Sequence, residues 1–403
     1  MKRLHIAMIG LVGTVMVFLC VILGRLLTQS VPSGAAHGNY GLVQEKKFRA
    51  GDIRSLEIDY GKGSAGLTDV LFYESPGDEI IVREYMNYEP EQSQLSAVEQ
   101  SDGELTIRGR GRSWFSFFSV GFRGAYTEVY LPAALARDME ALTVKTVSGD
   151  ISSKIGLGIR DGFVVSTTSG DMLFSEVQAG RIQVSSTSGD IQLDSAAAET
   201  LKLSTTSGDI AVEQAKGGTV ISSTSGQIRL SGLEGPLRVS TTSGDIRLGQ
   251  LAGDVSLSTT SGDITLEEVR GDFDAESTSG DIRVERLEGR FRTNTASGEL
   301  LLSGEKGFGT AHSVSGDISV SLADLTGDLE FSTTSGTVNI GLPGTASFQF
   351  GFHTSSGECE TFFEDALSFD KKRKNAEGRY GGGTHSVEIS TVSGDLTVEA
   401  VSE

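Results

Sequence analysis

An aspartate follows a Ser-Gly pair again and again along this sequence, and carboxylates at such regular spacing could bind cations. The row comprises Asp150, Asp171, Asp190, Asp209, Asp245, Asp263, Asp281, Asp317 and Asp395. Carboxylate oxygens suit calcium, so a cation could lie between successive members such as Asp245, Asp263 and Asp281. Alternatively, each aspartate accepts a hydrogen bond from a turn N–H two residues on. Gln227 and Thr337 interrupt the row and the paired glycines of calcium-binding nonapeptides are missing, which favours the turn account.

Other residue types that carry catalysis or bind metals are scattered. The five histidines are His5, His37, His312, His353 and His385, and none has a metal-ligand spacing. The Ser-Gly pairs lack the strand-to-helix context of a nucleophile elbow. We therefore expect no enzyme and no cofactor beyond the calcium considered above. The alternative is a carbohydrate-active enzyme on a β-helix, which would need a polar cluster that departs from the repeat.

The glycines that precede these aspartates recur at a nearly constant interval. Six successive intervals between Gly208 and Gly316 are eighteen residues each, and the others upstream of Gly357 range up to 21. A unit of this length has too little apolar surface to fold alone, so neighbouring units must stack and share a core. The variable interval and the absence of strict hexapeptides favour right-handed winding over left-handed.

Within each unit the apolar residues alternate with polar ones. Leu237 and Val239 form one such pair, and Ile246 and Leu248 form the next. Period-two alternation in short runs, broken by glycine turns, is typical of β-strands. The sequence therefore predicts an all-β fold, a single-stranded parallel β-solenoid with about 18 residues per coil, preceded by one N-terminal transmembrane helix.

The hydroxyl residues before each Ser-Gly turn should form rows along such a solenoid. If the alternation continues, Thr241 and Ser243 point inward while Ser240 and Thr242 point outward. Equivalent residues of stacked coils lie about 4.8 Å apart. The glycine itself would supply a positive φ or a close backbone approach. The outward rows are most simply a solvated surface, although an array of hydroxyls could also order water or carbohydrate.

Composition agrees with a repetitive exported protein. Glycine makes up 52 of 403 residues but proline only 6, which excludes collagen. The net charge of -20 disfavours binding to nucleic acid through overall charge. The two cysteines, Cys20 and Cys359, cannot form a disulfide framework.

The N-terminus predicts the location of the protein. Residues 6–24 carry no charge and are long enough to span a membrane, with Lys2 and Arg3 before them. We expect a signal anchor with a cytoplasmic N-terminus and the solenoid outside; secretion after signal cleavage near Gly34 is the alternative. Residues 1–30 hold three basic and no acidic groups, so the exported part would carry -23.

Four segments follow from these patterns. They are a signal anchor at residues 1–30, a juxtamembrane linker at 31–47, an irregular β cap or degenerate first coils at 48–141, and the solenoid repeats at 142–403. Between Glu360 and Gly383 the repeat lapses into an inserted loop or a degenerate coil, and its basic run Lys371-Lys-Arg-Lys374 is expected at a solvated loop tip.

One segment of the predicted cap is rich in aromatic and basic side chains. It is read either as core of the cap or as an exposed loop that contacts the membrane or a partner protein. The candidate contact residues are Arg112, Trp114, Phe115, Phe117, Phe118, Phe122 and Arg123.

A family resemblance rests on three sequence features. They are Tyr130-Leu-Pro132, then Leu142-Thr-Val-Lys-Thr-Val-Ser-Gly-Asp-Ile151 with its many echoes, and the ending from Gly381 to Leu396. Together they resemble the bacterial β-strand-repeat proteins known as putative adhesins of unknown function, over roughly residues 48–400. Members include membrane-anchored proteins encoded with cell-envelope stress systems of the Lia type. The resemblance implies the fold and supplies no catalytic residues.

We therefore expect a membrane-anchored extracytoplasmic protein that acts as an adhesin or as an envelope-associated binding or scaffold protein. The resemblance adds a link to envelope stress. The expected partners are the membrane, through the N-terminal helix, and an envelope protein or wall polymer. No nucleic acid is expected.

Overall fold

The computed structural model describes residues 40–61, 67–109 and 124–401, nearly all of which belong to one compact unit, Leu42–Glu403. The predicted membrane span at residues 6–24 lies outside these ranges. So do all seven residues of the predicted aromatic-basic contact. Within the described ranges, no helix is long and apolar enough to cross a membrane.

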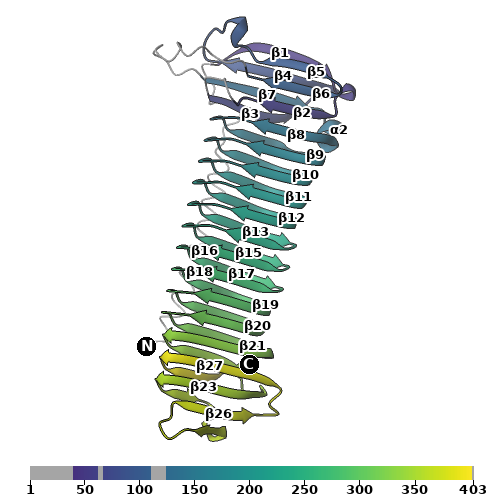
Figure 1. Ribbon diagram of the computed structural model, residues 1–403. Coiled ribbons are helices and arrows are strands. Elements are labelled where there is room, and N and C mark those ends of the chain that lie inside the picture. The colour runs from purple at the N-terminus through teal and green to yellow at the C-terminus, as the bar shows by residue number, and fades with distance from the viewer. Residues whose placement is uncertain (1–39, 62–66, 110–123, 402–403) are drawn as a thin grey trace, which may run out of the picture. The chain divides into compact units, whose positions relative to one another are not determined.

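The described chain consists almost entirely of β-strands (Figure 1). The first are β1 (Gly41–Arg49), β2 (Ser55–Asp59), β3 (Leu67–Glu74), β4 (Glu79–Met86), β5 (Ala97–Ser101), β6 (Glu104–Arg108), β7 (Gly124–Leu131), β8 (Met139–Lys145) and β9 (Ile151–Ser166). Next come β10 (Met172–Ser185), β11 (Ile191–Ser204), β12 (Ile210–Ser222), β13 (Ile228–Glu234), β14 (Leu237–Ser240), β15 (Ile246–Ala252), β16 (Val255–Thr259), β17 (Ile264–Arg270), β18 (Phe273–Ser277) and β19 (Ile282–Thr295). The last are β20 (Leu300–Ser313), β21 (Ile318–Ser335), β22 (Val338–Pro343), β23 (Phe348–Ser356), β24 (Cys359–Thr361), β25 (Leu367–Phe369), β26 (Asn375–Tyr380), β27 (His385–Ser393) and β28 (Leu396–Val401). Short helices are α2 (Ala133–Arg137) and the 3-10 turns η1 (Ala50–Asp52), η2 (Gln92–Gln94) and η4 (Glu364–Ala366).

Successive coils stack in parallel, which confirms the predicted β-solenoid. Ile228 lies beside Ile246, and Ile246 lies beside Ile264, eighteen residues further on each time. Over about 11 turns the coils average about 19 residues. The mean exceeds the predicted 18 because some coils are longer, as where Ile151 lies beside Met172. Right-handed winding stays a prediction.

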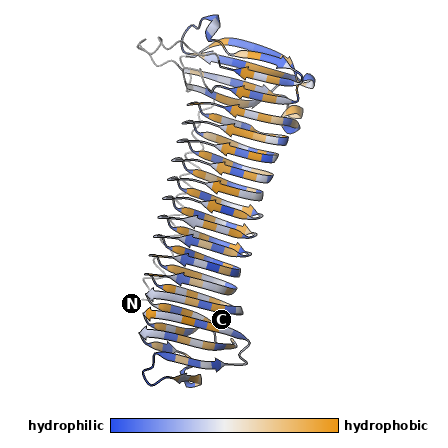
Figure 2. Cartoon of the chain, in the orientation of Figure 1, coloured by the Kyte–Doolittle hydropathy of each residue, from blue (hydrophilic) through white to orange (hydrophobic). Residues whose placement is uncertain are grey.

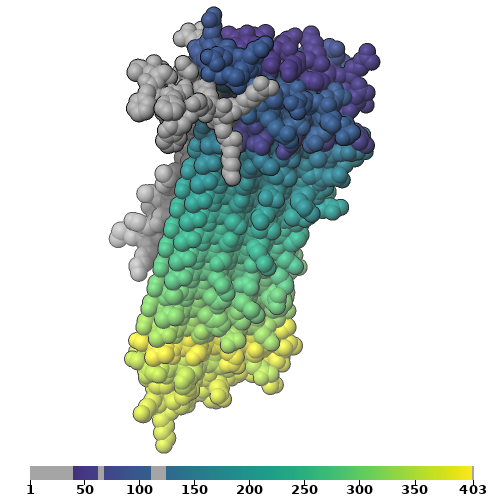
Figure 3. Space-filling model, turned by 45° about the horizontal axis from the view of Figure 1, so that its top comes forward, coloured from purple at the N-terminus to yellow at the C-terminus, as the bar shows by residue number. Residues whose placement is uncertain are grey.

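Each central coil contributes strands to two separate ladders. The first ladder runs through β13, β15 and β17, and we call its outer surface the leading face. The second runs through β14, β16 and β18 and the equivalent segments of β12, β19 and β20, and we call its outer surface the trailing face. Figure 3 shows the side chains of successive coils aligned in rows along the solenoid.

The core is built from the alternating apolar residues that the sequence indicates. Ile246, Leu248, Leu251, Val255 and Leu257 of one coil are each at most 3% exposed. Along the strands, hydrophobic and hydrophilic positions alternate (Figure 2). Burying each such side chain stabilises the fold by about 1.5–3 kcal/mol, and every added coil repeats the gain.

Glycine at the Ser-Gly turn allows the coils to approach one another. A Cβ atom on Gly244 would lie 1.9 Å from the carbonyl oxygen of Gly226 in the preceding coil. Of the two roles predicted for this glycine, the close backbone approach is therefore the relevant one. At the second turn the backbone itself also requires glycine, since Gly253 has a φ of +142°.

At the N-terminal end the order of strands in space differs from their order in the sequence. β2 lies between β6 and β8, and β3 lies between β7 and β9, all in parallel. β4 and β5 then pair antiparallel with β7 and β6, and β1 pairs with β4. Residues 48–141 thus hold both early coils and a cap. The expected linker at 31–47 is too long, because β1 begins at Gly41.

At the C-terminal end, too, the order of strands in space differs from their order in the sequence. β27 lies between β21 and β23, and β28 lies between β22 and β24, so the last strands of the chain are not the last rung (Figure 1). β26 covers β23 antiparallel, and β25 pairs with β26. The segment from Glu360 to Gly383, where the repeat lapses, therefore covers the end of the solenoid.

Candidate functional site

The aspartate row forms a ladder of hydrogen bonds between coils. Oδ1 of Asp245 accepts the backbone N–H of Asp263 at 3.2 Å, and Oδ1 of Asp263 accepts that of Asp281 at 3.0 Å. Oδ1 of Asp171 likewise accepts the N–H of Asp190 at 2.9 Å. The predicted acceptor role is right, but the donor lies one coil away and not two residues on. Stacking brings that N–H within reach because neighbouring strands are only about 4.8 Å apart.

These hydrogen bonds offset part of the repulsion within the row of like charges. Burial raises the pKa of Asp190, the N–H of Asp209 opposes that shift, and the charges of Asp171 and Asp209 add to it. Oδ2 of Asp245 accepts a hydrogen bond from Arg247 at 3.0 Å. In the part of the chain that the structure describes, no three His, Cys, Asp or Glu residues group closely enough to hold a metal. The geometry gives no support to the calcium hypothesis.

A threonine or serine three residues before the turn glycine closes the turn from inside. Oγ1 of Thr241 accepts the N–H of Gly244 at 3.1 Å, and Thr241 is buried. Ser240 and Thr242 are exposed as predicted. Ser243 is also exposed, so its predicted inward orientation is wrong. The alternation ends at Thr241 because the chain turns there.

The basic run near the C-terminus lies on an ordered turn. The carboxylate of Asp370 accepts the backbone N–H groups of Lys372 and Lys374 at 3.2 and 2.7 Å. Arg373 pairs with Glu364 at 2.5 Å and stacks on the ring of Phe369. The loop tip is exposed, as expected, but its arginine is engaged within the C-terminal cap.

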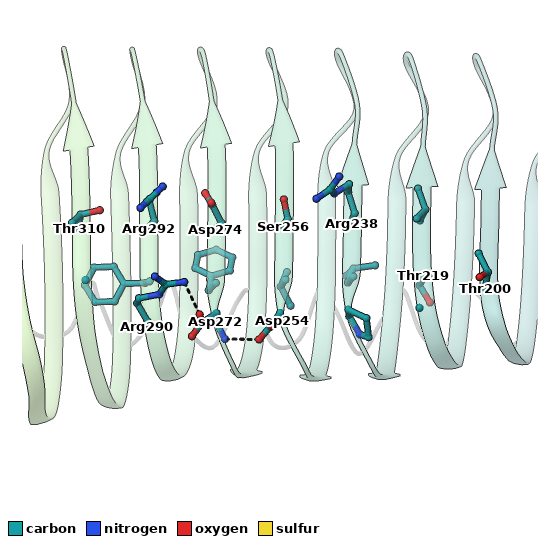
Figure 4. Close-up of a pocket in the computed structure, with 18 residues that line it drawn as sticks. Thr200, Thr219, Arg238, Asp254, Ser256, Asp272, Asp274, Arg290, Arg292 and Thr310 are labelled. Atoms are coloured by element: carbon teal, nitrogen blue, oxygen red, sulfur yellow. Dashed lines mark hydrogen bonds and ion pairs between the residues drawn. The ribbon is translucent and has the colours of Figure 1, made fainter.

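A groove of about 760 Å³ opens on the trailing face (Figure 4). It crosses successive coils from Thr200 to Thr310. One outward side chain per coil lines it: Val220, Arg238, Ser256, Asp274, Arg292 and Thr310. A second row, at the turns that precede these strands, adds Pro236, Asp254, Asp272 and Arg290.

The charges of the groove are only partly neutralised within it. Arg290 pairs with Asp272 at 2.6 Å, and the Asp272 N–H donates to Asp254 at 3.2 Å. Asp274 and Arg292 are register partners on neighbouring strands. Nevertheless Arg238, Asp274 and Arg292 form no ion pair with any residue that the structure describes. Two guanidinium groups and one carboxylate therefore remain available to a ligand.

Outward serines lie beside this groove on the same strands. The row comprises Ser166, Ser185, Ser204, Ser222, Ser240 and Ser258, of which the last three lie two residues beyond groove positions. Beside the rest of the groove, the same row continues with Glu276, Asn294 and His312. The hydroxyls of Ser222 and Ser240 are 3.5 Å apart. The trailing face thus offers a charged groove that serine hydroxyls border over part of its length.

Sequence reasoning missed the groove, although a signal was present. In each coil the position occupied by Arg238 varies, as other outward positions do, while inward neighbours such as Leu237 and Val239 are buried. Because the core, the turns and the ladder demand constant residues, variation at outward positions indicates a surface that the fold leaves free. Only the stacked geometry shows that this row lines a hollow.

A separate polar cluster is buried in the N-terminal cap. Glu84 is 3% exposed, and its two oxygens accept the hydroxyl and the N–H of Ser96 at 2.7 and 3.0 Å. The hydroxyls of Tyr60 and Thr127 lie 2.6 Å apart. Burial raises the pKa of Glu84, while the Ser96 hydrogen bonds and the charge of Lys46 oppose the shift. Hydrogen bonds within the cap account for this cluster.

In the described ranges, the residues that a carbohydrate-active enzyme could use are histidines and carboxylates. His312, His353 and His385 lie on three different strands. Of the groove carboxylates, Asp254 and Asp272 are exposed, and both are held by the partners given above. A general acid for glycoside cleavage needs a desolvated carboxyl opposite a second carboxylate.

Comparison with solved structures gives remote similarities. A putative adhesin from Parabacteroides merdae is 14% identical, with 69% of this chain and 97% of that one covered and a TM-score of 0.34. A putative adhesin from Parabacteroides distasonis is 15% identical, with 91% and 98% covered and a TM-score of 0.22. A putative cell adhesion protein from Clostridium sporogenes is 10% identical, with 90% and 100% covered and a TM-score of 0.18.

Family comparison is more decisive. No curated protein matches this chain. The family model described as Toastrack DUF4097 matches residues 65–252 and again residues 251–399, which together span most of the solenoid. The chain therefore belongs to the Toastrack DUF4097 family.

Proposed function

We propose that this chain is a non-enzymatic surface protein, an adhesin or an envelope-associated binding or scaffold protein. The observation that carries the proposal is the long regular solenoid, covered at both ends by antiparallel strands, with outward rows whose residues the fold leaves free to vary. Covered ends make it harder for copies to add strand to strand. The long faces between them are then free to bind.

The location of the protein is part of this proposal. Residues 6–24 would tether the chain to the cell membrane, with the N-terminus in the cytoplasm and the solenoid outside. The resemblance to proteins encoded with Lia-type systems adds a role in cell-envelope stress. A wall polymer or an envelope protein would be the partner, and the acidic net charge argues against nucleic acid.

Intact cells that express the full chain with a C-terminal tag test the location. External protease should remove the tag while the N-terminus stays with the membrane. Protection of the tag would contradict the orientation. Release of the chain into the medium would contradict the membrane tether and support secretion after signal cleavage.

Membranes that carry the full chain test the activity. Incubated with isolated wall polymer, they should retain it without shortening it. Shortened sugar products, in amounts that rise with time and protein, would contradict a non-enzymatic role and restore the alternative of a carbohydrate-active enzyme.

A further inference from the structure

We propose that the groove on the trailing face binds an extended, uncharged polysaccharide. This inference rests on the proposed binding function and names the class of ligand and its site. Three observations carry it: the direction of the groove, its charge, and the saturation of the backbone around it.

The groove follows the stacking direction of the coils. From Arg238 to Arg292 the chain advances by three coils, which places their backbones roughly 14 Å apart. Ser256 and Asp274 fill the two coils between them. The four rungs from Arg238 to Arg292 thus each carry a polar side chain, which suits a polymer that runs across the strands and offers hydrogen-bonding groups repeatedly along its length.

The lining is neutral although the protein is strongly acidic. The groove contains Arg238, Arg290 and Arg292 together with three aspartates, while the chain as a whole carries -20. An acidic polymer would be repelled by the surrounding protein and by the groove aspartates. Sugar hydroxyls both donate and accept hydrogen bonds, so they can use the guanidinium groups and the carboxylate of Asp274 alike.

A peptide fits this surface less well. The backbone groups of β14, β16 and β18 are already paired in parallel ladders, so no strand edge is free to take up another strand. The apolar side chains beneath the groove, including Leu237, Phe273 and Phe291, are at most 3% exposed and leave no open pocket for peptide side chains. Recognition must come from the outward polar groups and the neighbouring serine row.

The test uses the full-length protein in detergent and three soluble neutral polysaccharides: dextran, mannan and hydroxyethyl cellulose. Polygalacturonate and poly-glutamate serve as acidic sugar and peptide probes. The triple variant Arg238→Ala/Asp274→Ala/Arg292→Ala should weaken binding of a neutral polysaccharide by roughly tenfold or more, because each lost charged hydrogen bond matters. Binding is measured by affinity electrophoresis or calorimetry.

A matched control removes the same charges from the leading face. Arg229→Ala/Glu267→Ala/Arg283→Ala changes exposed residues of β13, β17 and β19 and should leave affinity unchanged. Both triple variants should retain the unfolding midpoint of the wild type. Equal losses in the two variants would overturn the proposed site.

The remaining outcomes separate this inference from the proposed function. If none of the neutral polysaccharides binds, or if only an acidic probe binds, the inference about the groove fails. If membranes still retain wall polymer when they carry the groove variant, the groove inference fails while the binding function stands. If a bound polysaccharide is cleaved, the non-enzymatic function fails while the site stands.

Discussion

Between Ile228 and Ile282 every coil pairs with the coil that precedes it in the sequence, eighteen residues away. At the two ends, strands pair with strands that lie several elements away in the sequence. Leu329 of β21 lies beside Val387 of β27, after the chain has already formed β22 to β26. The middle of the solenoid thus rests on local stacking, whereas the ends rest on strands that return and insert between earlier ones.

This difference assigns different roles to the two regions. Local stacking adds coils with nearly equal contributions and sets no natural length. The inserted strands close long loops, which costs more conformational entropy than local stacking. In return, they end the solenoid in an ordered structure at both ends. A solenoid whose last rungs are held on both sides also presents fewer open edges for aggregation.

The largest expected effect comes from a single side chain in the middle. Gly244→Val places atoms against the carbonyl of Gly226 and should lower the free energy of unfolding by about 3 kcal/mol or more. Denaturant unfolding measures it. Gly77→Val is the matched control, since a Cβ atom there meets nothing within 4 Å. Equal stability of the two variants would contradict backbone stacking as the reason for glycine.

Removal of an entire central coil should be tolerated better than that one substitution. Deletion of residues 246–263 joins Asp245 to Ile264 and restores the repeat, because Ile246 and Ile264 occupy equivalent positions. We expect a folded protein with one coil fewer and a slightly lower unfolding midpoint. An insoluble or unfolded product would mean that the middle is not modular.

The buried Glu84 makes the N-terminal cap sensitive to pH in an unusual direction. Its pKa is raised in the folded state, so its contribution to stability is complete below the ordinary value of about 4.3 and is lost as pH rises through the raised value. Relative to Glu84→Gln, the wild type should therefore lose stability as pH rises from about 4.3 through the raised pKa of Glu84. Thermal unfolding across this range checks it; a difference between the two proteins that does not vary with pH would contradict the burial argument.

The smallest expected effect concerns the aspartate ladder. Asp263→Ala removes the acceptor for the N–H of Asp281 and should lower stability by about 0.5–1.5 kcal/mol. Asp263→Asn keeps an acceptor oxygen and should lie close to the wild type. Addition of calcium should leave the midpoint of either protein unchanged. If calcium raised the unfolding midpoint of the wild type alone, that result would support the cation hypothesis.

The sequence predicts contacts between successive coils well, but not contacts between strands that lie far apart along the chain. Ile246, Leu248 and Gly244 repeat at a fixed interval, so coil length, core and turns follow from periodicity. The partner of β27 does not, because nothing in residues 385–393 distinguishes a final coil from an inserted one. The sequence predicts the wrong donor to the Asp263 carboxylate. An aspartate at this position suits a hydrogen bond within its own turn and one from the next coil equally well, so its presence does not distinguish the two.

Hydrogen exchange of the C-terminal strands tests the central claim most directly. If β27 and β28 are held between two rungs, the amides of His385–Val401 should exchange as slowly as those of Ile246–Thr259 and more slowly than those of β25 and β26. Fast exchange of His385–Val401, as expected of a frayed chain end, would contradict the inserted strands.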